Sequence, residues 1–154
     1  ERGIDFTLRF VGDGPDRKSL EAFTRDNQLN EHIQFLGKVN HDQVQLLQRE
    51  ADIFVIPSFA EGIPIVLMEA MASGTPCVTT HITGIPELFT HTQDGLLVRP
   101  GNAVMLADAL ALLINDEELR QSIATEALNT VKEKWCIHKS NQRLAQLFTR
   151  LLSQ

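Results

Sequence analysis

The segment EGIPIVLMEA, residues 61–70, is mostly apolar but contains two glutamates, Glu61 and Glu69, eight positions apart. An ionised carboxylate among apolar helical side chains is unfavourable unless a partner compensates its charge. The sequence has no Lys or Arg between Glu50 and Arg99, so no basic residue of the same helix can pair with Glu69. Glu69 therefore either meets a donor from a distant segment or contacts a ligand. Hydroxyl groups of a ligand would suit it, because each donates one hydrogen bond.

The loop PSFAEGIP precedes the helix that carries Glu69, which we expect over about residues 64–73. Gly62 frees the backbone there, and the first amides of the helix have no partner inside it. Such amides can receive an anion, and a diphosphate would fit. About six helical residues separate the helix start from Glu69, which is about 9 Å of rise. A molecule with hydroxyls at both ends and a diphosphate between them could therefore touch Glu61, the helix start and Glu69.

A second candidate is the turn GDGP, in which Gly12 and Gly14 stand between an expected strand and an expected helix. Glycines let the backbone turn tightly and let a ligand approach, and the helix start beyond favours an anion. The dinucleotide-binding pattern G-x-G-x-x-G fails, because Arg17 occupies the third glycine position and the second strand is followed by Lys38 instead of an acid. The turn is therefore either a tight connection only or the backbone wall of a ligand site.

Short apolar strands alternate with helices along the whole chain. We expect strands at 6–11, 33–36, 53–56, 76–79 and 95–98, and helices at 15–27, 41–50, 64–73, 84–89, 103–114, 117–135 and 138–152. This alternation predicts an α/β fold, a doubly wound, Rossmann-like open parallel sheet of about five strands with helices on both faces. Ligands of such sheets bind outside the carboxyl ends of the strands, where the loops at 12–15, 37–40 and 57–64 would lie.

Six local expectations accompany this fold. Gly74 is expected to end the helix at 64–73. Asn40 is expected to cap the helix at 41–50. The run IFVI at 53–56 is continuous and apolar, which predicts a strand buried on both faces. Cys77 is read as a small core residue. Trp135 and Phe148 are expected to anchor the last helices against the rest of the domain.

The 154-residue chain is 43% hydrophobic and 22% charged, which is typical of a globular protein. Its net charge of −6 and the lack of a basic stripe argue against nucleic acid as a partner. The five histidines show no metal-ligand spacing, and two cysteines are too few for a disulfide framework. No apolar run approaches the roughly 20 residues that cross a bilayer. We therefore expect a cytoplasmic protein, with peripheral attachment to the cytoplasmic face of the membrane as an alternative.

The stretches GDGP, FLGKV, ADIFVIPSFAEGIPIVLMEAMASGTPCVTT, GIPEL and DGLLVRPGN together resemble the C-terminal half of retaining glycosyltransferases of family 4, which have the two-domain GT-B fold. The likeness runs over residues 6–150, and its most specific part is the E-x7-E signature from Glu61 to Glu69. It implies the donor-binding domain of a hexosyltransferase that moves a sugar from a nucleotide-diphosphate sugar to a glycan or lipid-linked acceptor. Retention of the anomeric configuration, a role in polysaccharide biosynthesis, and a reaction without metal or cofactor are part of that implication.

The resemblance gives each candidate a role. Glu61 is expected to be the catalytic residue, in contact with the transferred sugar, and Glu69 to hold the ribose hydroxyls. The other donor-binding residues are expected to be Gly12, Gly14, Lys38, Val39, Gly62, Ile63 and Pro64. Of these, Lys38 and Val39 would lie against the base, and the backbone around Gly62 would face the sugar and diphosphate.

The resemblance also implies parts of the enzyme that this sequence does not show. A strand and helix before residue 1 would carry the Arg and Lys that neutralise the diphosphate, and an N-terminal domain would bind the acceptor. The chain opens on ERGID, which reads as the end of a helix entering a strand. We expect residues 1–154 to be a single nucleotide-sugar-binding domain without its first strand–helix unit, and to be inactive without the acceptor domain.

Two other functions stay open, a non-catalytic nucleotide- or sugar-binding module and a nucleotide-sugar epimerase of similar fold. A glycosidase that uses Glu61 and Glu69 as its carboxylate pair is disfavoured. Retaining hydrolases need carboxyls about 5 Å apart, which a separation of two helical turns fits poorly. An NAD-dependent dehydrogenase is disfavoured by Arg17 at the third glycine position.

Overall fold

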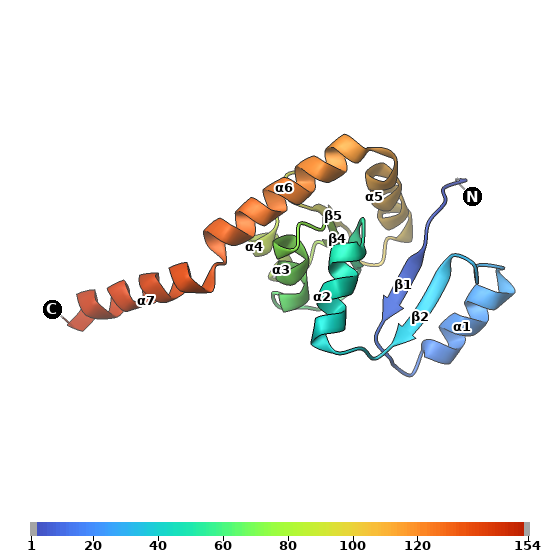
Figure 1. The fold of residues 1–154 in the computed structure, drawn as a ribbon, viewed down its shortest axis with the longest axis horizontal. Coiled ribbons are helices and arrows are strands. Elements are labelled where there is room, and N and C mark those ends of the chain that lie inside the picture. Colours follow the sequence, from blue (N-terminus) through green and yellow to red (C-terminus); the bar gives the residue numbers. More distant parts are fainter. Residues whose placement is uncertain (1–2, 153–154) are drawn as a thin grey trace. The chain divides into compact units, whose positions relative to one another are not determined.

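In the computed structural model the chain divides into two compact units, Glu1–Leu47 and Gln48–Gln154, and the structure describes residues 3–152. Every predicted element is present, with bounds within two residues of the expected ones (Figure 1). In order they are β1 (Leu8–Val11), α1 (Arg17–Asp26), β2 (Ile33–Gly37), α2 (His41–Glu50), β3 (Phe54–Ile56), α3 (Ile65–Ala72), β4 (Cys77–Thr80), α4 (Ile85–Leu88), β5 (Leu96–Val98), α5 (Ala103–Asn115), α6 (Glu117–Lys134) and α7 (Ile137–Leu152).

The first unit is built from β1, α1 and β2. The two strands pair in parallel, with Phe10 opposite Phe35, and the two rings stack with their centroids 5.2 Å apart. Arg17 ties α1 to β2, because its Nη2 donates to the Phe35 carbonyl at 3.2 Å. Its Nε donates to Glu21 Oε1 at 2.8 Å, and this hydrogen bond raises the pKa of Arg17. The arginine therefore fixes the first helix against the small sheet.

The predicted start of the first helix at Pro15 is wrong by two residues. The Arg17 amide donates to the Gly14 carbonyl at 3.2 Å, which makes the intervening residues a turn. Residues 3–7 form neither helix nor strand, and the remainder of the opening segment, Glu1 and Arg2, lies outside the described residues.

The second unit contains β3, β4 and β5 as a parallel sheet in the order β3-β4-β5. Successive side chains of a strand point to opposite faces, and helices cover both. Cys77 and Leu97 pack with α3, α4 and the second half of α6. Val78, Leu96 and Val98 pack on the other side with α5 and the first half of α6. The predicted α/β class with helices on both sides of parallel strands is confirmed.

The five strands differ from the prediction in their pairing, because they are divided between two sheets, β1-β2 and β3-β4-β5. Strand pairing depends on backbone hydrogen bonds, which nearly every residue can make. Apolar runs therefore locate the strands but do not show which strands pair with each other. β3 is an edge strand of its sheet, and its residues are half-buried instead of buried on both faces as predicted. β4 lies between β3 and β5 and is buried at every residue.

Several local expectations are confirmed. Asn40 Oδ1 accepts from the Gln43 amide at 2.9 Å while Gln43 Oε1 accepts from the Asn40 amide at 3.0 Å, a reciprocal cap of α2. Gly74 follows α3 with a φ of 74°, the left-handed conformation in which a glycine ends a helix. Cys77 is fully buried, and burial raises the pKa of its thiol. Trp135 packs against the core formed by α3, α4 and α6.

α7 follows α6 with every one of its residues exposed (Figure 1). Its exposed apolar side chains recur at helical spacing and include Ile137, Leu144, Leu147, Phe148 and Leu151. The prediction that Phe148 anchors the helix is wrong, because its side chain is 55% exposed. An apolar stripe indicates that one face of a helix packs against something, but it does not show which element covers that face.

We expect a chain that ends at Cys136 to keep its stability, with a change in Tm below about 2 °C. No side chain of α7 is buried, so its loss removes little of the apolar burial that stabilises the fold. Trp135 is the only tryptophan and the chain has no tyrosine, so its fluorescence reports melting. As a control, Ile123→Ala removes a buried side chain and should cost about 2–5 kcal/mol. A Tm loss for the truncated chain as large as that of the control would contradict the exposure of α7.

Candidate functional site

The glycine turn and the segment Lys38–Val39 lie together where β1 and β2 end. The Gly12 amide donates to the Gly37 carbonyl at 2.8 Å. Gly12 has a φ of 126° and Gly37 a φ of 72°, conformations that favour glycine. No atom lies within 4 Å of where a Cβ would stand on Gly12 or Gly14, so the backbone there is open. The four predicted residues thus share one edge of the first unit, and their contact with a ligand stays a prediction.

In the second unit Glu61, Gly62 and Ile63 lie in the loop that leads from β3 to α3. Pro64 is the N-cap of α3, with φ −68° and ψ 122°. The first amides of a helix have no carbonyl partner within it and favour an anion. The loop therefore brings a carboxylate and a helix start to the carboxyl end of β3.

The carboxylate of Glu61 is half-buried and has a defined partner. Ser58 Oγ donates to Glu61 Oε1 at 3.0 Å, so a hydroxyl from the same loop orients the carboxylate without cancelling its charge. This hydrogen bond joins two residues of one loop, of which the sequence predicted only Glu61.

Glu69 is half-buried, so it is not enclosed by the apolar side chains that surround it in the sequence. The buried residues of α3 are Leu67, Ala70 and Met71. Glu69 shares a face with Ile65, four residues earlier, whose side chain is 68% exposed. α3 is apolar on almost every side, so its sequence did not reveal which face is packed. Glu69 is therefore partly exposed to solvent, and its contact with a ligand stays a prediction.

The loop that follows β4 lies against the loop of Glu61, which sequence reasoning missed. Thr80 Oγ1 donates to the Ser58 carbonyl at 2.6 Å, and Thr83 Oγ1 donates to the Glu61 carbonyl. A Cβ on Gly84 would lie 2.8 Å from the Gly62 oxygen. The signal was present as two threonines ending a buried strand, since such hydroxyls can reach carbonyls of a neighbouring segment.

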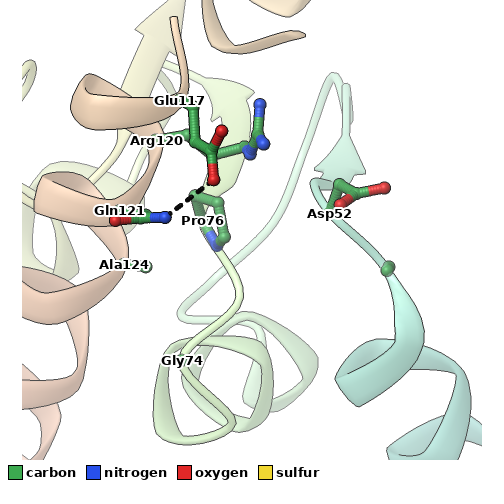
Figure 2. A pocket seen from close by; sticks show the side chains of 8 residues that line it. Asp52, Gly74, Pro76, Glu117, Arg120, Gln121 and Ala124 are labelled. Carbon is green, nitrogen blue, oxygen red and sulfur yellow. Dashed lines mark hydrogen bonds between the residues drawn. The ribbon is translucent and has the colours of Figure 1, made fainter.

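A hollow of about 280 Å³ lies at the opposite edge of the second unit, among residues that precede β3 and β4 and the first turns of α6 (Figure 2). Asp52, Glu117, Arg120 and Gln121 supply its polar side chains. Gln121 Nε2 donates to Glu117 Oε1 at 2.9 Å, and Arg120 Nη1 donates to a carbonyl of the last turn of α5 at 2.8 Å. Glu117, Gln121 and Arg120 thus already bind each other or the backbone. None of the predicted donor-binding residues lines the hollow. We assign no ligand to it.

Residues 3–152 contain neither a metal-binding cluster nor a membrane-spanning helix. No group of three or more His, Cys, Asp or Glu side chains in this range could hold a metal ion. No helix in the same range is both long enough and apolar enough to cross a membrane. A reaction without a metal stays a prediction.

Residues 1–130 match the sequence model of the family described as Glycosyl transferases group 1. The chain belongs to this family. Relatives of this chain include N-acetyl-alpha-D-glucosaminyl L-malate synthase of Bacillus anthracis, 34% identical over 132 residues, and the amylovoran biosynthesis glycosyltransferase AmsK of Erwinia amylovora, 32% identical over 157 residues. The matches cover 86% and 98% of this chain but 34% and 39% of the relatives. The chain thus spans between a third and two fifths of their length.

Solved structures of related glycosyl transferases share the fold. HepE from Anabaena, solved in complex with UDP, is 27% identical with a TM-score of 0.86 over 94% of this chain and 41% of its own. The C-terminal domain of the group 1 glycosyl transferase LpcC from Francisella tularensis is 30% identical, with a TM-score of 0.81 over 88% of this chain and 73% of its own. The chain therefore has the Rossmann-like fold of the C-terminal domain of GT-B glycosyltransferases.

Proposed function

We propose that this group 1 chain is the donor-binding domain of a retaining glycosyltransferase of family 4. The enzyme would transfer a hexose from a nucleotide-diphosphate sugar to a glycan or lipid-linked acceptor in polysaccharide biosynthesis. The observation that carries the proposal is the order of these groups along the chain: Glu61 lies in the loop that follows β3, the N-terminus of α3 comes next, and Glu69 is the fifth residue of α3. HepE, which shares the fold, is solved with UDP-glucose, and this supports a nucleotide-sugar donor.

The proposed roles follow the chemistry of each group. Glu61 contacts the transferred sugar, the backbone of residues 62–64 faces the sugar and diphosphate, and Glu69 accepts hydrogen bonds from the ribose hydroxyls. In the first unit, the proposed role of Lys38 and Val39 is to contact the base, and the proposed role of Gly12 and Gly14 is to let the donor approach the backbone.

The proposed reaction needs positioning and charge stabilisation and no metal or cofactor. The diphosphate leaves, an oxocarbenium-like centre forms, and the acceptor attacks from the same face, which retains the anomeric configuration. The α3 N-terminus stabilises negative charge on the leaving diphosphate, and the Glu61 carboxylate stabilises positive charge at the sugar.

The proposed enzyme also includes an N-terminal acceptor-binding domain, and the isolated 154-residue domain, without its first strand–helix unit, has no transferase activity. The greater length of the relatives supports this, as does the apolar stripe of α7, which no described element covers. The stripe is flanked by basic side chains, and α7 contains no acidic residue. A cytoplasmic location, with peripheral attachment to the membrane as the alternative, completes the proposal.

Calorimetric titration of the chain with UDP, GDP, ADP and their glucose conjugates tests the donor site. We expect Glu69→Ala to weaken the binding of both the nucleotide and its sugar conjugate by about tenfold, which is about 1.4 kcal/mol. The reason is that the ribose hydroxyls lose a charged acceptor.

The matched control is Glu118→Ala, which removes an exposed carboxylate in the first turn of α6 and should leave the affinity unchanged. Equal nucleotide affinity in wild type and Glu69→Ala would refute the ribose role. A chain that binds none of the nucleotides would refute the donor site as a whole.

A further inference from the structure

The hydroxyls of the last two residues of β4 donate hydrogen bonds to backbone carbonyls at the end of β3 and just after it. Thr79 Oγ1 donates to the Ile56 carbonyl at 2.9 Å, and Thr80 Oγ1 donates to the Ser58 carbonyl at 2.6 Å. Both threonines are buried. A carbonyl left without a partner in such a place costs about 1–3 kcal/mol. The two hydroxyls therefore fix the path of the backbone as it leaves β3.

The same connection reaches Glu61 at two points. Thr83 Oγ1 donates to its backbone carbonyl, and Ser58 Oγ donates to its carboxylate oxygen Oε1 at 3.0 Å. Thr80 therefore acts on the carboxylate through Ser58, because it holds the backbone of the residue whose side chain orients Glu61.

Gly84 lets the two loops come into backbone contact. A Cβ on Gly84 would lie 2.8 Å from the Gly62 carbonyl oxygen and 2.9 Å from Ile63 Cγ1, closer than non-bonded carbon atoms approach. The φ of Gly84 is −80°, which other residues adopt readily, so the need for glycine comes from space and not from backbone conformation. Any side chain at this position would displace the segment that follows Glu61.

We propose that Thr80, Thr83 and Gly84 are positioning residues that hold the Glu61 carboxylate and the Gly62–Ile63 backbone in the geometry that a donor sugar requires. The proposal rests on the proposed function of Glu61. It gives the loop after β4 an effect on the sugar half of the donor without contact to the donor. We call the contacts of Thr80, Thr83 and Gly84 with the loop of Glu61 the brace. Binding of the nucleotide half of the donor, which is proposed to contact Glu69 on α3, should depend less on the brace.

The ligand-free chain tests the brace by amide hydrogen exchange of the segment 57–66. We expect Thr80→Val, which removes only the hydroxyl at nearly constant volume, and Gly84→Ala to raise exchange there by about fivefold or more. Thr80→Ser keeps the hydroxyl and should restore the wild-type rate. Thr125→Val is the matched control, because Thr125 Oγ1 also donates to a backbone carbonyl, at 2.9 Å, within α6.

The same variants are then titrated with UDP and UDP-glucose. We expect the ratio of UDP-glucose affinity to UDP affinity to fall by about fivefold in Thr80→Val and Gly84→Ala, and to stay constant in Thr80→Ser and Thr125→Val. A change in this ratio reports the sugar half of the donor, because loss of general stability would lower both affinities.

The outcomes separate this proposal from the proposed function. Wild-type exchange rates in both Thr80→Val and Gly84→Ala would overturn the brace, whatever the chain binds. Faster exchange with a constant affinity ratio would overturn the role toward the sugar. A wild-type chain that binds neither ligand would overturn the proposed function and the sugar role with it, and the exchange rates would then decide the brace alone.

Discussion

Glu61→Gln in the longer enzyme that we propose contains this domain should lower kcat by about 10²–10³-fold, the size of effect seen when one group that stabilises transition-state charge is lost. The amide keeps the shape of the side chain and can still accept from Ser58 Oγ, which lies 3.0 Å from Glu61 Oε1. Only the negative charge is lost, and that charge is proposed to stabilise the oxocarbenium-like centre. The Kd for UDP should change by less than about twofold, because the side chain is proposed to contact the sugar and not the nucleotide.

Steady-state kinetics with the sugar donor, together with calorimetric titration with UDP, measure the two effects separately. Glu87→Gln is the matched control, because Glu87 is an exposed acid in the first turn of α4, the helix that follows the loop after β4. It should leave both quantities unchanged. If Glu61→Gln lowered UDP affinity as much as kcat, Glu61 would belong to the nucleotide site and the catalytic assignment would fail.

The elements and the class of fold could be predicted from the sequence because their signals are local. Asn40 caps α2 with a side chain three residues from its partner, and Gly74 ends α3 by its own conformation. Short apolar runs placed every strand for the same reason. The E-x7-E pair is also a local pattern, which is why Glu61 and Glu69 could be singled out before any coordinates.

Features that depend on contacts between distant segments could not be predicted. The hydroxyl of Thr80 and the carbonyl of Ser58 are 22 positions apart, and no local pattern marks them as partners. Phe148 has an apolar stripe around it but no described element against it. The partial exposure of Glu69 could not be predicted either, because α3 is apolar on almost every side and its sequence does not show which side packs against the core.

A buried carboxylate that the sequence did not mark, Asp94, joins the loop before β5 to α6. It is 1% exposed. Its Oδ1 accepts from the Thr90 amide at 2.6 Å and its Oδ2 accepts from the Thr130 hydroxyl at 2.8 Å. Burial raises the pKa of the Cys77 thiol, and the nearby Asp94 carboxylate adds to this rise. Asp94 therefore links the backbone at Thr90 to α6 through two hydrogen bonds.

We expect Asp94→Ala to lower the free energy of unfolding by about 3 kcal/mol, because the part-buried Thr90 amide and the buried Thr130 hydroxyl both lose a charged acceptor, worth roughly 1.5–3 kcal/mol for each hydrogen bond. Urea unfolding followed by Trp135 fluorescence measures the loss, which is large against a domain stability of about 5–15 kcal/mol. Asp94→Asn should cost less, since its amide oxygen can still accept from the Thr90 amide.

Asp116 is the matched control, because it is exposed and accepts from the Leu119 amide at 2.9 Å as the N-cap of α6. Asp116→Ala should cost about 1 kcal/mol. Equal losses at the two aspartates would show that burial of the Asp94 network adds nothing to an ordinary helix cap.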